Sequence, residues 1–585
     1  MRDLVLLRCA DRAALARAVD HARDVMARHA AGDVEIEFWQ HERAGLALIQ
    51  SQARAAGDWL AMHSTRGEAF AYSGFVAQTA YQPGEVRRLI ELDGAPVMTR
   101  SPGGIATYFL ADAKAGRVAA WSSHAGMEGP YVTAGEHCTA ISNRPLLSHL
   151  VGRGSERPSF SARWARRVLL GGATLWDDTP FEGTILPPPR TAVVVGDELR
   201  FTAHPVPLAG RYGKRDPAGV EALCAAALEA VAPLRRWPRG ELWLSGGKDS
   251  RFAAALVRRA GIDVDVVTHG RDGAGEGVAA AAVARALGLP HRITQAGGIA
   301  TGDDLLPTVL ANLRRSDGLV AEGRHLAYPP PTHGGEPIIQ GQAHHARGGY
   351  RCGWAPPHLI RAQLVDATIG DAALVAGDVV AERRARLDEI LDSYSVRQPS
   401  ELAYWLYSDW RMTRWTTGAY RAAAAARPVV WPMMDERVLT VTAGLHPADR
   451  VREVAYFDAM IHLAPDLEPI PLYEDIWRFD AGPAAGRDWP DNFESRRAPF
   501  REHGRGRTDE RRVATIQPLF RFAMNDVAAG RAVARAIRPE VLRALCDEAD
   551  PALALGRPHM QIINFMWKAT AVALVTEGSW LTPAS

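Results

Sequence analysis

The first part of the chain alternates short apolar segments with turn-forming residues. Two of these segments, TAVVV (191–195) and LRFTAHPV (199–206), have the length of single strands, and the proline-rich stretch GTILPPPR (183–190) predicts a loop before them. The polar stretch RYGKRDP (211–217) follows and predicts a boundary between domains. We therefore predict a mixed, strand-rich domain over residues 1–210.

After this boundary, helical and extended patterns alternate. Asp216 can cap a helix whose first residue is Pro217, and Gly261 is suited to end the next helix. Strands that alternate with helices predict a parallel sheet with helices on both of its faces. The expected helices span 217–234, 250–260 and 278–288, and the expected strands span 241–244, 262–268, 290–295 and 336–340.

The rest of the second domain, which we assign to residues 211–585, adds helices to this sheet. Residues 303–470 are mostly helical in pattern, and residues 516–585 predict C-terminal helices. Between them, residues 481–513 are poor in apolar side chains and rich in Arg, Gly, Pro and Asp. This composition predicts a mobile loop or lid.

The composition narrows the class of protein. A chain of 585 residues is too long for one hydrophobic core, and 47% hydrophobic residues is ordinary for a soluble protein. A net charge of +1 indicates neither nucleic acid nor a membrane surface as partner. Because there is no signal-peptide pattern and no apolar run of about 20 residues, we expect a cytoplasmic protein. The five cysteines are scattered, so neither a disulfide framework nor a zinc site is expected.

The stretch WLSGGKDS (243–250) lies between an expected strand and an expected helix. Backbone N–H groups of Gly246 and Gly247, with the helix N-terminus, would present donors to an anion. A Walker A loop is excluded, because Leu242 stands where its first glycine belongs and Asp249 follows the lysine. An aspartate repels phosphate unless a divalent cation lies between them, so Asp249 indicates Mg²⁺.

SGGKDS (245–250) resembles the SGGxDS pyrophosphate loop of the asparagine synthetase family, whose members cleave ATP between its α and β phosphates. IIQGQAHHARGGY (338–350) and VVWPMMDERVLTVTAGLHP (429–447) resemble two further segments of that family. The resemblance implies a parallel-sheet domain of the adenine nucleotide α-hydrolase (HUP-like) type that uses ATP and Mg²⁺. The residues it places at ATP and pyrophosphate are Leu244, Ser245, Gly246, Gly247, Lys248, Asp249, Ser250, Arg251, Val267, Thr268 and Gly270.

The N-terminal part resembles the glutaminase-type domain of the same family. The segments 171–194 and 139–147 (TAISNRPLL) carry this likeness, which implies an Ntn-type αββα sandwich over residues 1–210. Such glutaminases use a cysteine exposed by methionine removal, whereas residue 2 here is Arg2 and the nearest cysteine is Cys9. The domain is therefore expected to be degenerate and to release no ammonia from glutamine.

The second motif departs from the family, because His344 and His345 stand where relatives carry an acidic pair. Three interpretations stay open: a metal ligand at His344, another active-site role, or shaping of the loop. Mg²⁺ prefers oxygen ligands, which disfavours the first. The two histidines and Glu322 are also candidates for the base that serves the attacking amine. Lys248 is expected to neutralise the pyrophosphate as it forms.

Without a working glutaminase, the amine is expected to belong to the substrate, as in β-lactam synthetases and lasso peptide cyclases. The sequences SGGKDSR and RGGY (347–350) resemble the cyclases, whereas the Tyr–Glu dyad of β-lactam synthetases has no counterpart. Aromatic and basic residues at helical spacing predict either core packing or the wall of a peptide cavity. The residues assigned to this cavity are Tyr350, Arg411, Arg414, Trp415 and Lys568.

The function implied by the resemblance is that of a lasso peptide macrolactam synthetase. It would adenylate an Asp or Glu side chain of a leader-free core peptide, and the N-terminal α-amine would close the ring and release AMP. Its partners would be the linear core peptide, a leader peptidase and a leader-binding protein. The alternatives are an asparagine synthetase-like or β-lactam synthetase-like amide ligase that acts on a small molecule, and a nucleotide sensor without catalysis.

Overall fold

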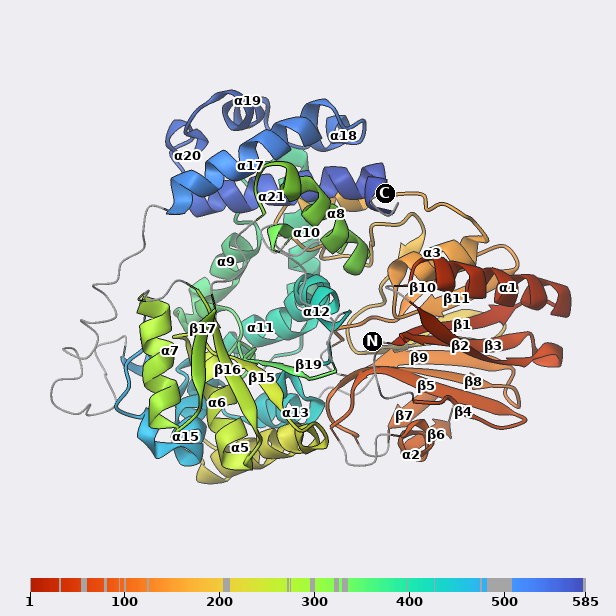
Figure 1. Cartoon of the computed structure of the whole chain (residues 1–585), viewed down its shortest axis with the longest axis horizontal. Helices are drawn as coiled ribbons and strands as arrows, with labels where there is room; N and C mark the ends of the chain where they lie inside the picture. Colours follow the sequence, from red (N-terminus) through yellow and green to blue (C-terminus); the bar gives the residue numbers. More distant parts are fainter. Residues whose placement is uncertain are drawn as a thin grey trace.

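The computed structural model contains two antiparallel sheets, a parallel sheet and a group of C-terminal helices (Figure 1). In Figure 1 the antiparallel sheets lie at the right, the parallel sheet at the lower left and the C-terminal helices at the top. The structure describes residues 2–30, 33–53, 60–77, 82–93, 95–98, 101–123, 126–203, 211–270, 273, 275–294, 300–319, 326–328, 335–396, 398–425, 427–473, 476–480 and 508–581.

The N-terminal region forms two six-stranded antiparallel sheets packed face to face. Period-two alternation explains the packing: Leu4 and Leu6 of the first strand face the second sheet, and Val5 and Leu7 face helices. The first sheet has the order β12 (Thr184–Ile185), β10 (Tyr131–Ala134), β11 (Cys138–Ser142), β1 (Arg2–Cys9), β3 (Leu46–Ala53), β2 (Val34–His41). The second has the order β14 (Leu199–Ala203), β13 (Thr191–Val195), β9 (Arg117–Ser122), β8 (Ile105–Asp112), β5 (Glu68–Phe75), β4 (His63–Ser64).

The outer layers of this sandwich differ from the expected αββα order. Helices α1 (Arg12–Arg28) and α3 (Pro145–Arg153) cover the first sheet. The outer face of the second sheet packs instead against the short helix α2 (Pro83–Arg87) and the hairpin of β6 (Ile90–Asp93) and β7 (Ala95–Met98). Among the described residues, the layer outside the second sheet is therefore mainly a hairpin rather than a pair of helices. The apolar residues between β5 and β8 occur in short runs, which suit short strands.

A disulfide corrects the expectation drawn from the scattered cysteines. Cys9 at the end of β1 and Cys138 at the start of β11 are directly paired across the antiparallel ladder and are bonded. Their sequence separation of 129 residues gives no local spacing signal. While this bond is present, Cys9 has no free thiol and cannot act as a nucleophile in place of a cysteine at residue 2.

The second region is built on a five-stranded parallel sheet, as predicted. Its order is β17 (His291–Thr294), β16 (Val264–His269), β15 (Gly240–Trp243), β18 (Ile338–Gln340), β19 (Val429–Val430). Asp216 caps α5 (Pro217–Val231) by accepting from Ala218 N, and Gly261 ends α6 (Lys248–Ala260) with φ 64°. Both helix boundaries predicted from the sequence are confirmed.

Most of the helices that pack on this sheet lie on one face. Leu242, Val266 and Ile339 share a core with α5, α6, α7 (Gly275–Ala286) and α15 (Val454–Leu463). On the opposite face Glu241, Trp243 and Asp265 are partly exposed. On that same face, however, Ile338 and Val429 are buried, and α12 (Thr417–Ala424) packs against β19. Helices therefore cover part of each face, as predicted.

Helices connect the parallel sheet to the rest of the molecule. After α8 (Leu305–Arg315), α9 (Pro357–Thr368) and α10 (Gly377–Ser393), the chain forms α11 (Ser400–Trp405), a π-helical segment (Leu406–Thr416) and α12 (Thr417–Ala424). Then follow α13 (Glu436–Gly444) and α14 (Pro447–Val451), before α15. The C-terminal group consists of α17 (Thr508–Asn525), α18 (Gly530–Ala534), α19 (Pro539–Asp547), α20 (Pro551–Ala554) and α21 (His559–Glu577).

The start of α17 corrects part of the predicted mobile loop 481–513. Residues 481–507 lie outside the described residues, but the chain is helical from Thr508 and Val513 is buried. The C-terminal helices share one hydrophobic core with α1 and α3.

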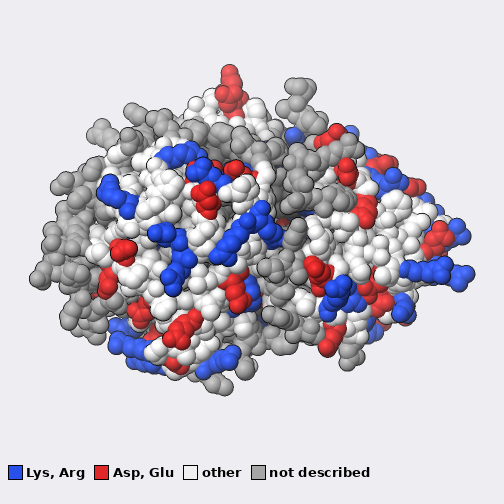
Figure 2. All heavy atoms as spheres, turned by 60° about the horizontal axis from the view of Figure 1, so that its bottom comes forward, with Lys and Arg blue, Asp and Glu red and all other residues white. Residues whose placement is uncertain are grey.

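One described stretch, Pro217–Arg236, is long and apolar enough to cross a membrane. It consists of α5 and the helical turn after it, and it packs against α6, α13 and α15. On the face of the molecule shown in Figure 2, acidic and basic side chains are interspersed. This mixture fits the net charge of +1.

Candidate functional site

The glycine loop joins the end of β15 to the start of α6. Ser245 Oγ accepts a hydrogen bond from Gly247 N (3.2 Å), and Ser250 Oγ accepts one from Ser245 N (3.0 Å). A Cβ at Gly246 would stand 2.8 Å from the Cβ of Tyr473, so a larger residue does not fit there. These contacts hold the backbone in a curve that can present N–H groups to an anion.

This loop lies at the topological switch point of the parallel sheet. From β15 the sheet continues to β16 and β17 on one side and to β18 and β19 on the other. Open α/β sheets bind their ligands in the crevice at such a point, beyond the C-terminal ends of the strands. We call this position, beyond the C-terminal ends of β15 and β18, the crevice. There the segment after β18 packs closely on the start of α6: a Cβ on Gly341 would lie 2.2 Å from the carbonyl carbon of Asp249.

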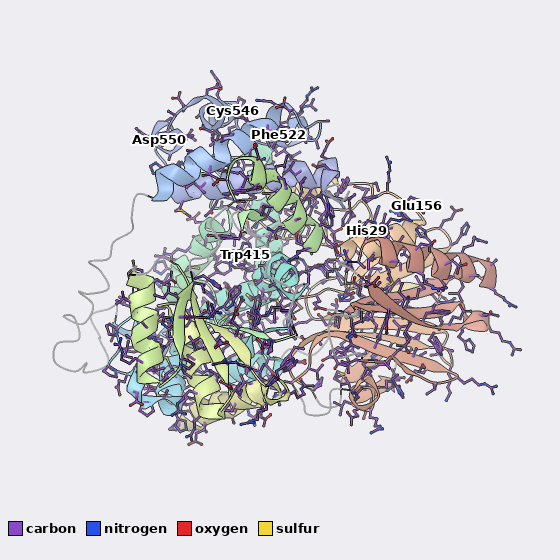
Figure 3. The ribbon with its side chains drawn as sticks, viewed as in Figure 1. His29, Glu156, Trp415, Phe522, Cys546 and Asp550 are labelled. Carbon is purple, nitrogen blue, oxygen red and sulfur yellow. A yellow bond between two sulfur atoms is a disulfide. The ribbon has the colours of Figure 1, made fainter. Side chains whose placement is uncertain are left out.

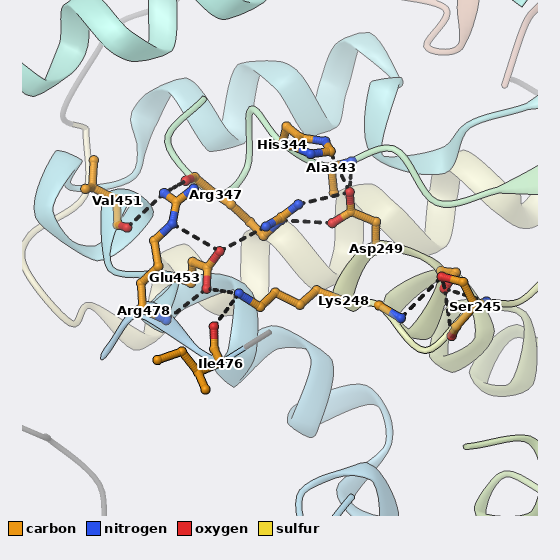
Figure 4. Close-up of polar contacts among 12 residues, drawn as sticks. Ser245, Lys248, Asp249, Ala343, His344, Arg347, Val451, Glu453, Ile476 and Arg478 are labelled. Atoms are coloured by element: carbon orange, nitrogen blue, oxygen red, sulfur yellow. Dashed lines mark hydrogen bonds and ion pairs between the residues drawn. The ribbon is translucent and has the colours of Figure 1, made fainter. Parts of the chain in front are cut away.

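Asp249 is held by the segment that follows β18 (Figure 4). Its Oδ2 accepts hydrogen bonds from Ala343 N (3.2 Å) and Arg347 Nη2 (3.1 Å), and its Oδ1 lies 2.9 Å from Arg347 Nε. Burial would raise the pKa of Asp249, but Arg347 and His344 outweigh it and lower the pKa to about 2. The side chain is therefore an anion at neutral pH.

The position of Asp249 suits a magnesium ligand that shares the ion with phosphates. Its Oδ1 is buried and accepts no aligned hydrogen bond, although Arg347 Nε is at ion-pair distance. Among the described residues, no group of three His, Cys, Asp or Glu side chains could hold a metal ion. Mg²⁺ at nucleotide sites is commonly bound by one or two carboxylates together with substrate phosphates. The donor set therefore fits a cation that arrives with a triphosphate.

The two adjacent histidines have different surroundings. Nδ1 of His344 lies 3.3 Å from Asp249 Oδ2, its ring stacks on Tyr407 at 5.6 Å, and 45% of its side chain is exposed. Burial, which outweighs the attraction of Asp249, lowers the pKa of His344 to about 4, so the ring is neutral at pH 7. His345 has no exposed surface, which favours a role in shaping the loop. The third candidate base, Glu322, lies outside the described residues.

Lys248 is not where the sequence placed it. Its ammonium donates to Glu453 Oε2 and to the carbonyl of Ile476, both at 2.7 Å, and it lies 5.2 Å from the ring of Trp477. The side chain is 4% exposed. The expected contact with pyrophosphate is therefore corrected, because the first residue of α6 points along the flank of the helix toward residues 476–480.

Arg251, one turn further along α6, also donates hydrogen bonds to backbone carbonyls of the segment before Ile476. Its guanidinium donates to the carbonyls of Ile470 and Pro471 and has no exposed surface. Burial lowers the pKa of Arg251 to about 10, which leaves it charged at pH 7. Lys248 and Arg251 thus attach the backbone at Ile470, Pro471 and Ile476 to the first turns of α6. Their donors are directed to these carbonyls and, for Lys248, to Glu453.

Glu453 joins three cationic side chains and was not singled out by the sequence. It has φ 65° and no exposed surface, and besides Lys248 it accepts from Arg347 Nη1 (3.0 Å) and Arg478 N (3.0 Å). Burial would raise the pKa of Glu453, but Lys248 and Arg347 outweigh it and lower the pKa. Asp249, Arg347 and Glu453 therefore form one continuous buried network with Lys248 and Arg478 (Figure 4).

Three of the residues assigned to ATP, namely Val267, Thr268 and Gly270, lie at or just after the end of β16. Val267 and Thr268 are buried, and Thr268 Oγ1 donates to the carbonyl of Leu244 at 2.7 Å. Gly270 N donates to the carbonyl of Thr294 at 3.0 Å. The end of β16 thus lies beside the glycine loop, and the Thr268 hydroxyl joins the two segments. The predicted contact of these residues with ATP stays a prediction.

Three of the assigned cavity residues lie near His344. The ring of Tyr350 meets that of Tyr407 edge-on at 5.3 Å, and the Arg411 guanidinium lies 5.8 Å from the Tyr407 ring and 4.1 Å from the Trp415 ring. Trp415 lies in the middle of the molecule, between the C-terminal helices and the parallel sheet (Figure 3). Together these residues form an aromatic and basic wall beside the crevice.

The other two assigned cavity residues have structural roles. Arg414 donates to the carbonyls of Leu186 (3.2 Å) and Pro187 (2.7 Å), which belong to the N-terminal sandwich. Lys568 pairs with Asp371 and donates to the carbonyl of Leu169 at 2.8 Å. Both side chains are therefore corrected from cavity to packing, since partners far along the chain take up their donors.

Comparison with known proteins adds little to this geometry. No protein-family model and no curated protein matches the chain. One similar solved structure is a glutamine phosphoribosylpyrophosphate (PRPP) amidotransferase from B. subtilis complexed with ADP and GMP, with a TM-score of 0.23, 9% identity, and coverage of 68% of this chain and 95% of that one. Another is an allosteric regulatory enzyme of purine biosynthesis, with a TM-score of 0.23, 10% identity, and coverage of 63% and 78%. Likenesses this weak carry no conclusion about this chain.

Proposed function

We propose that this chain is an ATP-dependent, AMP-forming amide ligase of the asparagine synthetase type that closes a ring in a peptide, as lasso peptide macrolactam synthetases do. The observation that carries the proposal is the ionised Asp249, which lies beside a glycine loop at the switch point of a parallel sheet. A HUP-like nucleotide site requires this combination of strand, loop and helix N-terminus.

In the proposed reaction a substrate carboxylate attacks the α phosphorus of ATP. Pyrophosphate leaves, and a substrate amine then displaces AMP from the acyl-adenylate and loses one proton as the amide forms. Mg²⁺, when bound, would neutralise charge on the phosphates, and Asp249 is the described side chain that would hold it. The curved backbone at Gly246 and Gly247 would bind the pyrophosphate.

The wall made by Tyr350, Tyr407, Arg411 and Trp415 supports a substrate larger than ammonia. Aromatic faces and a guanidinium suit extended contact with peptide side chains and carbonyls. His344 stands between this wall and Asp249 with a neutral, partly exposed ring. It is therefore placed to accept a hydrogen bond or a proton from an attacking amine.

The N-terminal sandwich supports an amine that comes with the substrate. Arg2, at the start of β1, carries no thiol, and its guanidinium lies 4.5 Å from the centre of the Tyr72 ring. Cys9, the nearest cysteine, is bonded to Cys138. Neither residue can supply a thiol for release of ammonia in this state.

Incubation with ATP, Mg²⁺ and candidate linear core peptides tests the proposal. We expect release of pyrophosphate and AMP, together with a peptide product lighter by one water. Release with a small carboxylate and a free amine, but with no peptide, would favour the small-molecule ligase. ATP binding without any pyrophosphate release would favour a nucleotide sensor. The leader peptidase and the leader-binding protein stay predictions that follow from a peptide product.

A further inference from the structure

Arg347 links the two carboxylates of the buried network. Through Nε and Nη2 it contacts Asp249 at 2.9 and 3.1 Å, and through Nη1 it donates to Glu453 Oε1 at 3.0 Å. Only 8% of its side chain is exposed. The guanidinium therefore lies between the glycine loop and the body of the protein.

The network joins cationic and anionic side chains from four segments of the chain. Among the described residues, Lys248, Arg347 and Arg478 are its cations and Asp249 and Glu453 are its anions. None of these side chains is more than 13% exposed.

The three cations differ in what holds them. Lys248 is satisfied by Glu453 and the Ile476 carbonyl, and Arg478 Nη1 donates to the carbonyls of Arg347 (2.8 Å) and Val451 (3.2 Å). Nε and Nη2 of Arg347, in contrast, contact Asp249, the side chain suited to a cation. If Asp249 turns to that cation, these two N–H groups become available beside the glycine loop.

The two glycines after Arg347 fix the origin of its side chain. Gly348 and Gly349 have φ 81° and 74°, and an added Cβ would lie 2.9 Å from Val451 Cα and 2.5 Å from the Ala403 carbonyl oxygen, respectively. The turn is thus both left-handed and tightly packed. Because this turn is closely packed, the backbone at Arg347 is held in place. The guanidinium therefore stays close to the crevice.

We propose that Arg347 is a catalytic residue that contacts the pyrophosphate of bound ATP, anchored to Glu453 by Nη1 while Nε and Nη2 donate to phosphate oxygens. This inference rests on the proposed function and gives Arg347 the role that the sequence assigned to Lys248. A guanidinium suits the task because its planar donors match two phosphate oxygens at once.

Calorimetric titration of the full chain with inorganic pyrophosphate and Mg²⁺, without peptide, tests this contact. We expect Arg347→Met to weaken pyrophosphate binding about a hundredfold and Arg347→Lys about tenfold, since charge-assisted hydrogen bonds of this kind are lost. Adenosine should bind both variants as it binds the wild type. Arg361→Met, which alters a partly exposed arginine paired with Asp388 and Asp392, is the matched control and should bind pyrophosphate normally.

Pyrophosphate binding within twofold of the wild type in a folded Arg347→Met variant would overturn the inference. If that variant does not fold, undiminished binding by Arg347→Lys would overturn it in the same way. If the wild type binds neither ATP nor pyrophosphate, the proposed function itself fails. The two failures are therefore distinguishable from one set of titrations.

Discussion

The antiparallel sandwich and the parallel sheet differ in the surroundings of one charged residue each, Arg2 and Asp249. At the start of β1, Arg2 lies over Tyr72 and donates to the carbonyl of Leu60, so the position contributes to packing. At the end of β15, a buried network keeps Asp249 ionised beside a crevice. The comparison teaches that one half uses its charged position for packing, while the other half holds an ionised carboxylate beside a glycine loop. Substitutions should therefore change stability in the first and turnover in the second.

The largest effect is expected from Asp249→Asn. Loss of the carboxylate removes the described side chain suited to Mg²⁺, and we expect pyrophosphate release to fall at least about a hundredfold. A coupled pyrophosphate assay measures this change. Asp265→Asn on the neighbouring strand, where the side chain is 38% exposed, is the control and should leave the rate unchanged. Equal rates for Asp249→Asn and the wild type would refute the assignment.

Glu453→Gln should be the most destabilising of the changes considered. It leaves Lys248, Arg347 and Arg478 without their shared carboxylate, and breaking a buried ion pair from one side costs about 3 kcal/mol or more. Urea denaturation measures the free energy of unfolding. Glu389→Gln, in which a 65% exposed side chain loses its pairing with Arg386, should cost less than about 1 kcal/mol. Similar costs for the two variants would show that the network does not support the crevice.

His149 in α3 tests the view that the N-terminal sandwich is structural. It is 1% exposed, its Nδ1 lies 3.0 Å from Thr184 Oγ1, and its Nε2 accepts from Ser159 N at 3.1 Å. Burial lowers the pKa of His149 to about 4 from an ordinary value of 6.5. Between these values the unfolded chain binds the proton and the folded chain does not, so stability falls as the pH drops from about 6.5 to 4.

The contribution of His149 should reach roughly 2 to 3 kcal/mol at pH 4. Denaturation of the wild type and of His149→Gln at a series of pH values measures it, and the variant should lose less stability on acidification. His137→Gln, in which the side chain is 64% exposed, should keep the wild-type slope. Equal slopes for wild type and His149→Gln would contradict the prediction.

The smallest effect on turnover is expected from Arg2→Ala. The change removes a cation–π contact worth about 1 kcal/mol and should lower the free energy of unfolding by that amount. Pyrophosphate release should stay within about twofold of the wild type, because the contacts of Arg2 lie in the sandwich. A loss of activity without loss of stability would show that the two sheet systems are coupled through this position.

Local signals in the sequence predicted much of the fold. The N-cap Asp216, the left-handed Gly261 and the alternation around WLSGGKDS placed α5, α6 and β15 within a few residues. These features depend on neighbours along the chain, so a one-dimensional pattern carries them. The position of Asp249 in the crevice followed from the same pattern.

The partners of the charged residues could not be predicted in this way. Lys248 and Glu453 are 205 residues apart, and Arg414 and Pro187 are 227 apart. Each of these pairs depends on how distant elements pack. Glu453 gave no signal, since a left-handed non-glycine residue looks like any other glutamate in the sequence. The motif RGGY contains Arg347, but nothing in the motif indicates that Arg347 pairs with Asp249 and Glu453.

The π-helical segment Leu406–Thr416 makes contacts in two different parts of the molecule, one near each of its ends. Near its start, Tyr407 stacks on His344, and near its end Arg414 binds carbonyls of the sandwich. A helix of 3.6 residues per turn rotates by about 100° for each residue removed. Shortening the segment by one residue would therefore satisfy one of these attachments only at the expense of the other. Its wide turns thus set the rotation between the side chains near Asp249 and those that contact the N-terminal sandwich.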